Sequence, residues 1–228
     1  MLVFDVEGTL FDSGAALPGT QLTSTIWQAI ARALGPEAVE EEVATHERWN
    51  AGEYASYLDW MRETIEIHIR HRLMEDDFRG LVESAPLKEG ALEFFTRLDK
   101  EKAIPVLVSG GFRALTDRAQ RELPIRHAFA ACDYFFGDSG EITGYNLLPC
   151  DFDGKIDFIR LMLNEYHLTF EDWAFVGDGK NDVPIATRAP MSIAYAAHPD
   201  LVEASTHATS SFDGVGDLLA QYGLIGED

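Results

Sequence analysis

Apolar residues occur in two different patterns along the chain, and each pattern predicts a different kind of secondary structure. Residues 2–6 (LVFDV) form a continuous apolar run that is interrupted only by one Asp near its end. Such a run is typical of a strand that is buried on both faces of a parallel sheet. Between about residues 20 and 85 the apolar residues recur at helical spacing instead, as in Leu58, Met61 and Ile65. We therefore expect one buried strand, followed by a long helical stretch.

Turn residues divide this helical stretch into several pieces. Gly35-Pro36 and the sequence Asn50-Ala51-Gly52 both interrupt the helical pattern. Glycine and proline at such positions end one helix and precede the next. We therefore expect at least three helices and no strand between residues 20 and 85.

The part of the chain after Pro86 alternates between strand and helix patterns. Its short apolar runs predict strands at 104–108, 173–177 and 191–195, and a segment at 128–148 is rich in strand-forming residues and contains a hairpin signal, EITGYN. Helices are expected at 89–101, 113–122, 153–167 and 181–187 and near the C-terminus.

This alternation predicts an α/β fold, a doubly wound three-layer parallel sheet of the Rossmann-like kind. The helical stretch lies between the first strand and the others, so it is expected to be an inserted helical cap. The predicted boundaries are 1–14 and 86–228 for the catalytic core and 15–85 for the cap.

Polar residues follow several of the predicted strands. Asp5 and Glu7 follow the first strand, Ser109 and Gly110 the second, and the sequence GDGKND (177–182) a third. Ligands of doubly wound sheets bind beyond the carboxyl ends of the strands, where the strand order reverses. These groups are therefore expected to meet in one pocket, and Lys155, at the start of a helix between the last two groups, is expected to join them.

The residue types in this pocket fit phosphoryl transfer with a metal ion. A carboxylate such as Asp5 can attack phosphorus and form an aspartyl-phosphate, which divides a difficult hydrolysis into two steps. A phosphate dianion would be repelled by Asp5 unless a cation lay between them. Mg²⁺ is held by one or two carboxylates together with substrate oxygens, and Asp5 and Asp178 supply such carboxylates.

Other residues of the pocket suit the charge and the proton of this reaction. The Ser109 hydroxyl, the Gly110 N–H and the Lys155 ammonium would distribute the negative charge of the phosphoryl oxygens. Glu7 would give a proton to the leaving alcohol and later activate water.

Composition limits the partners of such an enzyme. The net charge of −21 argues against nucleic acid, because binding a polyanion requires phosphate-neutralising Lys and Arg residues. No apolar run approaches the ~18 residues of a membrane span, and no basic and apolar leader precedes the first strand. We therefore expect a cytoplasmic protein that acts on a small phosphorylated metabolite. Nothing in the sequence indicates an oligomeric state.

Four short motifs, in this order, resemble those of the haloacid dehalogenase superfamily. They are FDVEGTLF (4–11), LVSGGF (107–112), DGK (153–155) and FVGDGKND (175–182). The SGGF sequence and the position of the helical stretch are similar to the phosphoserine phosphatase branch. The resemblance implies a Mg²⁺-dependent phosphatase that acts on phosphomonoesters.

Roles for individual residues also follow from the resemblance. It implies that Asp5 is nucleophile and Mg²⁺ ligand, that Glu7 gives its backbone carbonyl to the metal and its side chain to proton transfer, and that Asp178 ligates the metal with support from Asp182 and Asn181. Thr9, Ser109 and Lys155 would bind the phosphate. Arg62 is the candidate in the cap for binding the rest of the substrate.

One catalytic position departs from the family, since Glu7 stands where an Asp is usual. Glutamate is one methylene longer, so the geometry of proton transfer must differ. Two alternatives to hydrolysis therefore stay open: a phosphotransferase, and a phosphate-binding regulatory domain in which Glu7 no longer supports turnover. The intact Asp5, Lys155, Asp178 and Asp182 favour the enzyme.

Overall fold

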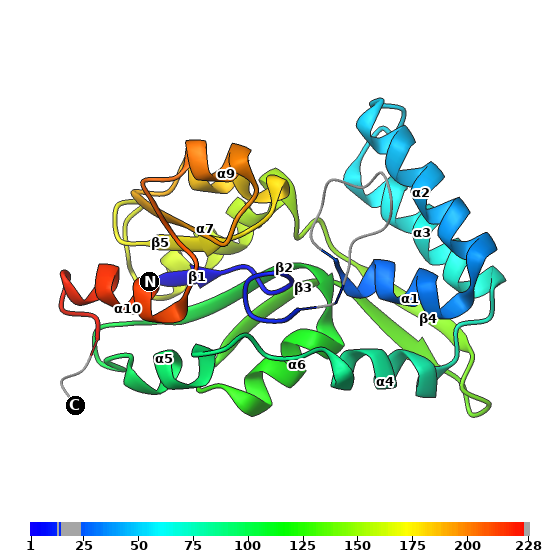
Figure 1. Cartoon of the computed structure of the whole chain (residues 1–228), viewed down its shortest axis with the longest axis horizontal. Helices are drawn as coiled ribbons and strands as arrows, with labels where there is room; N and C mark the ends of the chain where they lie inside the picture. Colours follow the sequence, from blue (N-terminus) through cyan, green and yellow to red (C-terminus); the bar gives the residue numbers. More distant parts are fainter. Residues whose placement is uncertain (13, 15–23, 226–228) are drawn as a thin grey trace.

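A mostly parallel sheet forms the centre of the protein (Figure 1). The computed structural model describes residues 1–12, 14 and 24–225. The strand order is β4-β3-β2-β1-β5-β6-β7, and only β3 and β4 pair in the antiparallel direction. The strands are β1 (Leu2–Phe4), β2 (Pro105–Phe112), β3 (His127–Phe136), β4 (Ile142–Leu147), β5 (Ala174–Gly177), β6 (Met191–Tyr195) and β7 (His207–Thr209).

Helices cover both faces of this sheet (Figure 1). Side chains of a strand alternate between the faces, so Leu2 and Phe4 pack in one apolar cluster and Val3 in the other. The Phe4 face packs against α5 (Ala91–Arg97), α6 (Arg113–Glu122) and α10 (Phe212–Ala220). The Val3 face packs against α7 (Lys155–Glu165), α8 (Val183–Ala186) and α9 (Pro199–Ala204). The three layers confirm the predicted α/β class.

The segment from residue 24 to 85 is helical, and its helices lie at one end of the sheet (Figure 1). Gly35 separates the first two helices with a φ of 113°, and Pro36 begins the second of them, where a missing N–H costs nothing. The described part of this segment contains no strand, only an isolated bridge at Met74. The helices are α1 (Ile26–Leu34), α2 (Pro36–Asn50), α3 (Tyr57–Arg70) and α4 (Glu75–Ser84).

The helical segment and the sheet share one apolar cluster. Trp27, Ile30 and Trp60 of the segment belong to the same cluster as Leu2 and Phe4. In Figure 1, α4 lies beside α6 in the layer below the sheet, whereas α2 and α3 extend above it. The division into a core and a cap stays a prediction, and its boundary at residue 15 lies outside the described residues.

Two predicted elements differ from the observed ones. Strand β2 does not end at residue 108 but continues through Ser109 to Phe112, with a register shift against β3 between these two residues. Near the C-terminus, a single helix was expected, whereas the structure has α9, β7 and α10. Strand β7 consists of His, Ala and Thr, so no apolar run marks it in the sequence.

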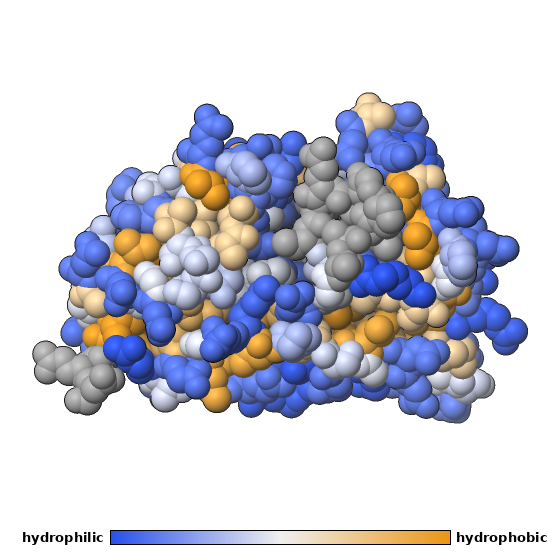
Figure 2. Space-filling view, in the orientation of Figure 1, coloured by the Kyte–Doolittle hydropathy of each residue, from blue (hydrophilic) through white to orange (hydrophobic). Residues whose placement is uncertain are grey.

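The visible surface is mainly hydrophilic. Figure 2 shows that hydrophilic residues cover most of the visible face, with apolar residues between them. Within the described part of the chain, no helix has both the length and the apolar character that a membrane span requires.

Candidate active site

The candidate site lies at the carboxyl end of β1, in the middle of the sheet. Strand β1 pairs with β2 on one side and with β5 on the other, and both pairs are parallel. The chain therefore leaves β1 at the point where the strand order reverses, which is where doubly wound sheets bind ligands. Asp5 is the first residue after β1, and its N–H donates to the Val176 carbonyl of β5 at 2.9 Å. This hydrogen bond fixes the backbone of Asp5 at the centre of the site.

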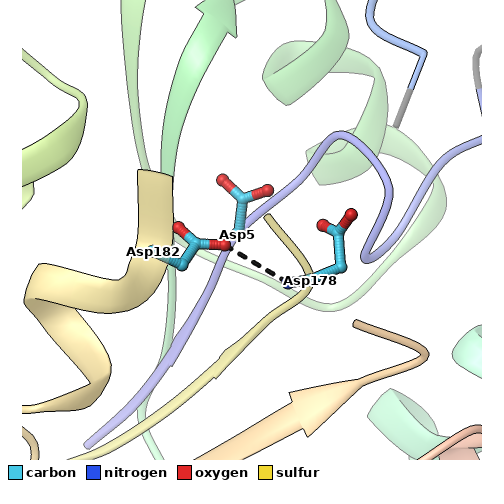
Figure 3. A group of neighbouring side chains, drawn as sticks. All are labelled: Asp5, Asp178 and Asp182. Carbon is cyan, nitrogen blue, oxygen red and sulfur yellow. Dashed lines mark hydrogen bonds between the residues drawn. The ribbon is translucent and has the colours of Figure 1, made fainter. Parts of the chain in front are cut away.

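Three buried carboxylates meet at this position (Figure 3). Asp5 comes from the loop after β1, Asp178 from the loop after β5, and Asp182 from the end of the short helical turn η2 (Lys180–Asp182). One oxygen of each lies within 4.8 Å of one oxygen of the others. Like charges this close repel one another strongly in a buried environment, so the cluster requires cations.

Lys155 supplies one of these cations. Its side chain is fully buried, and Nζ donates to Asp5 Oδ1 at 2.6 Å and to Asp182 Oδ1 at 2.7 Å. Burial by itself lowers the pKa of an ammonium, but the carboxylates of Asp182 and Asp5 outweigh it and hold the pKa of Lys155 well above its ordinary value. The helix α7, which begins at Lys155 after the turn η1 (Phe152–Gly154), places this charge beside Asp5.

One ammonium does not balance three carboxylates. Burial raises the pKa of Asp5 well above its ordinary value, Lys155 opposes this shift, and the nearby Asp182 and Asp178 add to it. The cluster therefore keeps an excess of acidic groups. Clustered carboxylate oxygens suit a hard cation such as Mg²⁺.

The loop after β1 also fixes Asp178. Thr9 is fully buried, and its Oγ1 donates to Asp178 Oδ1 at 2.9 Å. Gly8 has a φ of 85°, and a Cβ on it would lie 2.1 Å from Asp178 Oδ2, so only glycine fits there. Thr9 was predicted to bind phosphate. The structure places it against Asp178 and not among the residues that line the pocket.

Asp182 organises the loop that carries Asp178. Its Oδ1 accepts from Lys155, and its Oδ2 accepts from the N–H groups of Asp178 at 3.2 Å and Gly179 at 3.1 Å. Both oxygens of Asp182 are therefore occupied, and the residue holds Lys155 and the Asp178 loop in place.

A pocket opens beside Asp5, between the sheet and the helical segment. On the sheet side the lining includes the predicted residues Asp5, Glu7, Ser109 and Gly110 together with Asp151. On the helical side it includes Trp27, Gln28, Glu42, His46, Tyr57 and Trp60. The strand-end residues and the helical segment therefore face each other across one cavity.

Glu7 points into this pocket with one carboxyl oxygen unused. Its Oε2 accepts from the N–H of Ile26, the first residue of α1, at 2.9 Å, whereas Oε1 is buried and has no hydrogen-bond partner among the described residues. Burial raises the pKa of Glu7 to about 8, although the Ile26 N–H opposes this. A Cβ on Gly111 would lie 2.1 Å from Oε1, so a glycine at this position leaves room for the longer side chain.

The Ser109–Gly111 segment forms the wall next to Glu7. Ser109 is buried, and its Oγ accepts from the Gly111 N–H at 3.0 Å. The Gly110 carbonyl accepts from Tyr57 Oη at 2.8 Å and from Trp27 Nε1 at 3.3 Å, so two residues of the helical segment hold this peptide group. A Cβ on Gly110 would lie 2.3 Å from Asp151 Oδ2, which again requires glycine.

Asp151 is a site residue that the sequence did not reveal. It lines the pocket, and its Oδ1 accepts from Asn181 Nδ2 at 2.8 Å and from the Phe152 N–H at 2.9 Å. An Asp before a helical turn is ordinarily interpreted as an N-cap, which Asp151 also is. Asp151 could have been found from its spacing, because it lies four residues before Lys155 and the two side chains then face the same side of the turn.

Arg62 does not join the other predicted site residues. Its side chain is 50% exposed and pairs with Asp59 at 2.7 Å, one turn earlier on α3. The residues that α3 presents to the pocket are Tyr57, Trp60 and Met61. Arg62 lies beside these positions on the solvent-facing side of the helix.

A family model and several known proteins that resemble this chain all indicate the same family. A family model described as a haloacid dehalogenase-like hydrolase matches residues 1–190. The phosphoserine phosphatase of Halobacterium salinarum is 26% identical over 225 residues, which cover 98% of this chain and 99% of that protein. The phosphoserine phosphatase of Lactococcus lactis is 36% identical over 94 residues, which span only 41% of this chain and 43% of that protein.

A solved structure has the same fold. A phosphoserine phosphatase described as a phospho-aspartyl intermediate analogue superposes with a TM-score of 0.74 at 21% identity and covers 97% of both chains. The arrangement of strands and helices in this chain is therefore also the fold of that phosphoserine phosphatase.

Proposed function

The chain belongs to the haloacid dehalogenase-like hydrolase family and is a phosphatase, and from this premise we propose that Asp5 attacks the phosphorus of a small phosphomonoester. The observation that carries the proposal is the position of Asp5: a buried carboxylate at the switch point of the sheet, on the wall of the pocket, with Oδ1 held by Lys155. A carboxylate held in this way is oriented for attack.

The reaction then proceeds in two steps. A bond forms between an Asp5 oxygen and phosphorus while the bond from phosphorus to the ester oxygen breaks, and the alcohol leaves with a proton. Water next attacks the phosphorus of the aspartyl-phosphate, releasing inorganic phosphate and restoring Asp5. The hydroxyl of Ser109, the N–H of Gly110 and the ammonium of Lys155 stabilise the charge on the phosphoryl oxygens.

Mg²⁺ is the cofactor that the acidic cluster fits. Asp5 and Asp178 would hold it through carboxylate oxygens, together with the backbone carbonyl of Glu7, while Asp182 positions the Asp178 loop and Lys155. The bound ion would neutralise the repulsion between the phosphate dianion and Asp5.

Glu7 is the proton donor of the first step and the base of the second. Its Oε1 is buried at the pocket without a hydrogen-bond partner among the described residues, while Oε2 is fixed by α1. A carboxyl group that is anchored through one oxygen presents the other to the leaving alcohol. The longer side chain of glutamate is accommodated because residue 111 is glycine.

Hydrolysis of p-nitrophenyl phosphate in the presence of Mg²⁺ tests this function. We expect the Asp5→Asn variant to lose at least about 10³-fold in kcat, since an amide is no nucleophile for this step. Asp157→Asn is the matched control, because this aspartate is 79% exposed on α7. Equal rates for wild type and Asp5→Asn would overturn the proposal.

A further inference from the structure

The helical side of the pocket differs chemically from the phosphate side. It presents aromatic rings and one buried carboxyl group, that of Glu42 on α2. This side faces the part of the substrate that departs as the alcohol, because Asp5 and Ser109 occupy the opposite wall. Its residues therefore determine which phosphate esters fit.

Glu42 is a carboxyl group without a protein partner for one of its oxygens. The residue is 6% exposed, and Oε2 is buried with no hydrogen-bond partner among the described residues. Leaving a buried carboxyl oxygen unpaired costs free energy, so such a group marks a place where a ligand supplies the missing donor. Burial also raises the pKa of Glu42 to about 7, a shift that a bound cation would reverse.

Aromatic rings line the same pocket as this carboxyl group. His46, at a centroid distance of 5.2 Å, and Trp49, at 4.9 Å, both stack on Trp60, and Tyr57 meets Trp60 edge-on. Hydrogen bonds to the Gly110 carbonyl fix the rings of Tyr57 and Trp27. Rigid aromatic walls beside a carboxylate are the combination that binds organic ammonium groups.

At this end of the pocket, no described side chain carries a positive charge that could pair with a negatively charged leaving group. None of the described residues that line the pocket is Arg or Lys, and the residues from 13 to 23 include neither in the sequence. His46 is not a substitute, because burial lowers the pKa of its imidazole and keeps it neutral. Arg62 points away, paired with Asp59.

We propose that the pocket takes the phosphate ester of an amino alcohol, with the ammonium group beside the Glu42 carboxylate in the aromatic-lined end of the pocket and without a carboxylate on the leaving group. This inference rests on the proposed function and adds the substrate class to it. Phosphoserine carries both an ammonium and a carboxylate, and the second group would be buried here without a cation.

Substrate comparison with the wild-type enzyme is the first test. The substrates are phosphocholine, phosphoethanolamine, phosphoserine and 3,3-dimethylbutyl phosphate, a neutral analogue with the shape of phosphocholine. We expect kcat/KM for at least one of the two cationic esters to exceed that for the neutral analogue and for phosphoserine about 10-fold or more. The difference in kcat/KM between phosphocholine and phosphoethanolamine shows whether the pocket prefers a quaternary or a primary ammonium group.

The Glu42→Gln variant is the second test, read as the ratio of kcat/KM for the preferred cationic ester to that for the neutral analogue. We expect this ratio to fall about 10-fold, because glutamine keeps the shape but not the charge. Glu40→Gln removes the same charge from an exposed position two residues earlier on α2, and its ratio should equal that of wild type.

The two tests separate this inference from the proposed function. If wild type hydrolyses p-nitrophenyl phosphate through Asp5 but prefers phosphoserine or the neutral analogue, the substrate class is wrong and the phosphatase stands. If no phosphate ester is hydrolysed, both fail. A Glu42→Gln variant that lowers kcat/KM for cationic and neutral esters equally would also contradict the role of Glu42.

Discussion

The carboxylates at the two ends of the pocket differ in their hydrogen-bond partners. At the sheet end, Asp5, Asp182 and Asp178 have hydrogen-bond partners, and Lys155 alone contacts two of these carboxylates. At the helical end, Glu42 has a buried oxygen with no partner among the described residues, and aromatic rings replace charged neighbours. The aspartates of the sheet end are thus held by protein partners before a ligand arrives, and only Glu7 Oε1 waits there for a partner, the leaving alcohol. At the helical end the ligand itself supplies the partner of the carboxyl group.

This difference separates the chemistry from the choice of substrate. The phosphoryl group is the same in every phosphomonoester, so a preorganised set of charges serves all of them. The alcohol varies, and the helical segment that contacts it lies outside the strand-end framework. Substitutions of Asp5 and Lys155 should therefore affect all substrates alike, whereas those at the helical end should change mainly the ratio between substrates.

The largest effect is expected at Lys155. Replacing it by methionine leaves Asp5 and Asp182 buried without their ammonium, which should lower the free energy of unfolding by about 3–5 kcal/mol. All phosphatase activity should be lost with it. Denaturant unfolding and p-nitrophenyl phosphate assays measure both. Lys180→Met, at an exposed lysine paired with Asp200, is the control, and an equal loss there would contradict the assignment.

A smaller effect, dependent on the leaving group, is expected at Glu7. The Glu7→Gln variant should lose about 10²–10⁴-fold in kcat/KM on an alkyl phosphate, whose alcohol needs a proton to leave. This quantity excludes the hydrolysis of the aspartyl-phosphate, in which Glu7 acts on every substrate alike. The loss should be much smaller on p-nitrophenyl phosphate, since p-nitrophenolate leaves without one. Steady-state assays of both substrates decide this. Equal losses would mean that Glu7 has only a structural role.

The rule that ligands bind beyond the carboxyl ends of the strands locates the residues at the sheet end of the pocket, but it says little about those at the helical end. Asp5, Ser109 and Asp178 each lie at or just after the carboxyl end of a buried apolar run, so the sequence pattern alone brings them together. Whether a residue on a helix lines the pocket depends instead on how that helix is rotated about its axis. Arg62 was predicted to bind substrate, and the rotation of α3 turns it to solvent.

The three consecutive glutamates of α2 illustrate the same limit. Glu40 is exposed, Glu41 pairs with Arg70, and Glu42 is buried in the pocket. In the sequence this run is typical of a solvated helix face, and only tertiary packing distinguishes its third member.

The pH dependence of substrate preference should be smaller still. With a pKa of about 7 in the free enzyme, Glu42 is mostly protonated at pH 6 and mostly ionised at pH 8. The ratio of kcat/KM for phosphocholine to that for its neutral analogue should therefore rise, by up to about 10-fold, across this range. The ammonium of phosphocholine makes its phosphate more acidic than that of the neutral analogue, so each kcat/KM is first divided by the fraction of substrate present as the dianion. Ionisation of Glu7 and Asp151 affects both substrates and cancels in the ratio. A flat profile would exclude Glu42 as the titrating group.

The smallest effect is expected at Arg62. Since its side chain is half exposed and paired only with Asp59, Arg62→Ala should change kcat/KM for every substrate, phosphoserine included, by less than about twofold. A selective loss on phosphoserine would show that Arg62 reaches the substrate after all, and would favour a carboxylate-bearing substrate.

Chemical trapping of the phosphorylated enzyme shows directly whether Asp5 is the nucleophile. The enzyme is mixed with substrate and Mg²⁺, quenched in acid and analysed by peptide mass spectrometry. We expect one phosphoryl group on the peptide that contains Asp5, in wild type and in Asp157→Asn but not in Asp5→Asn. A phosphoryl group on another residue, or substrate turnover at an undiminished rate in Asp5→Asn, would contradict it.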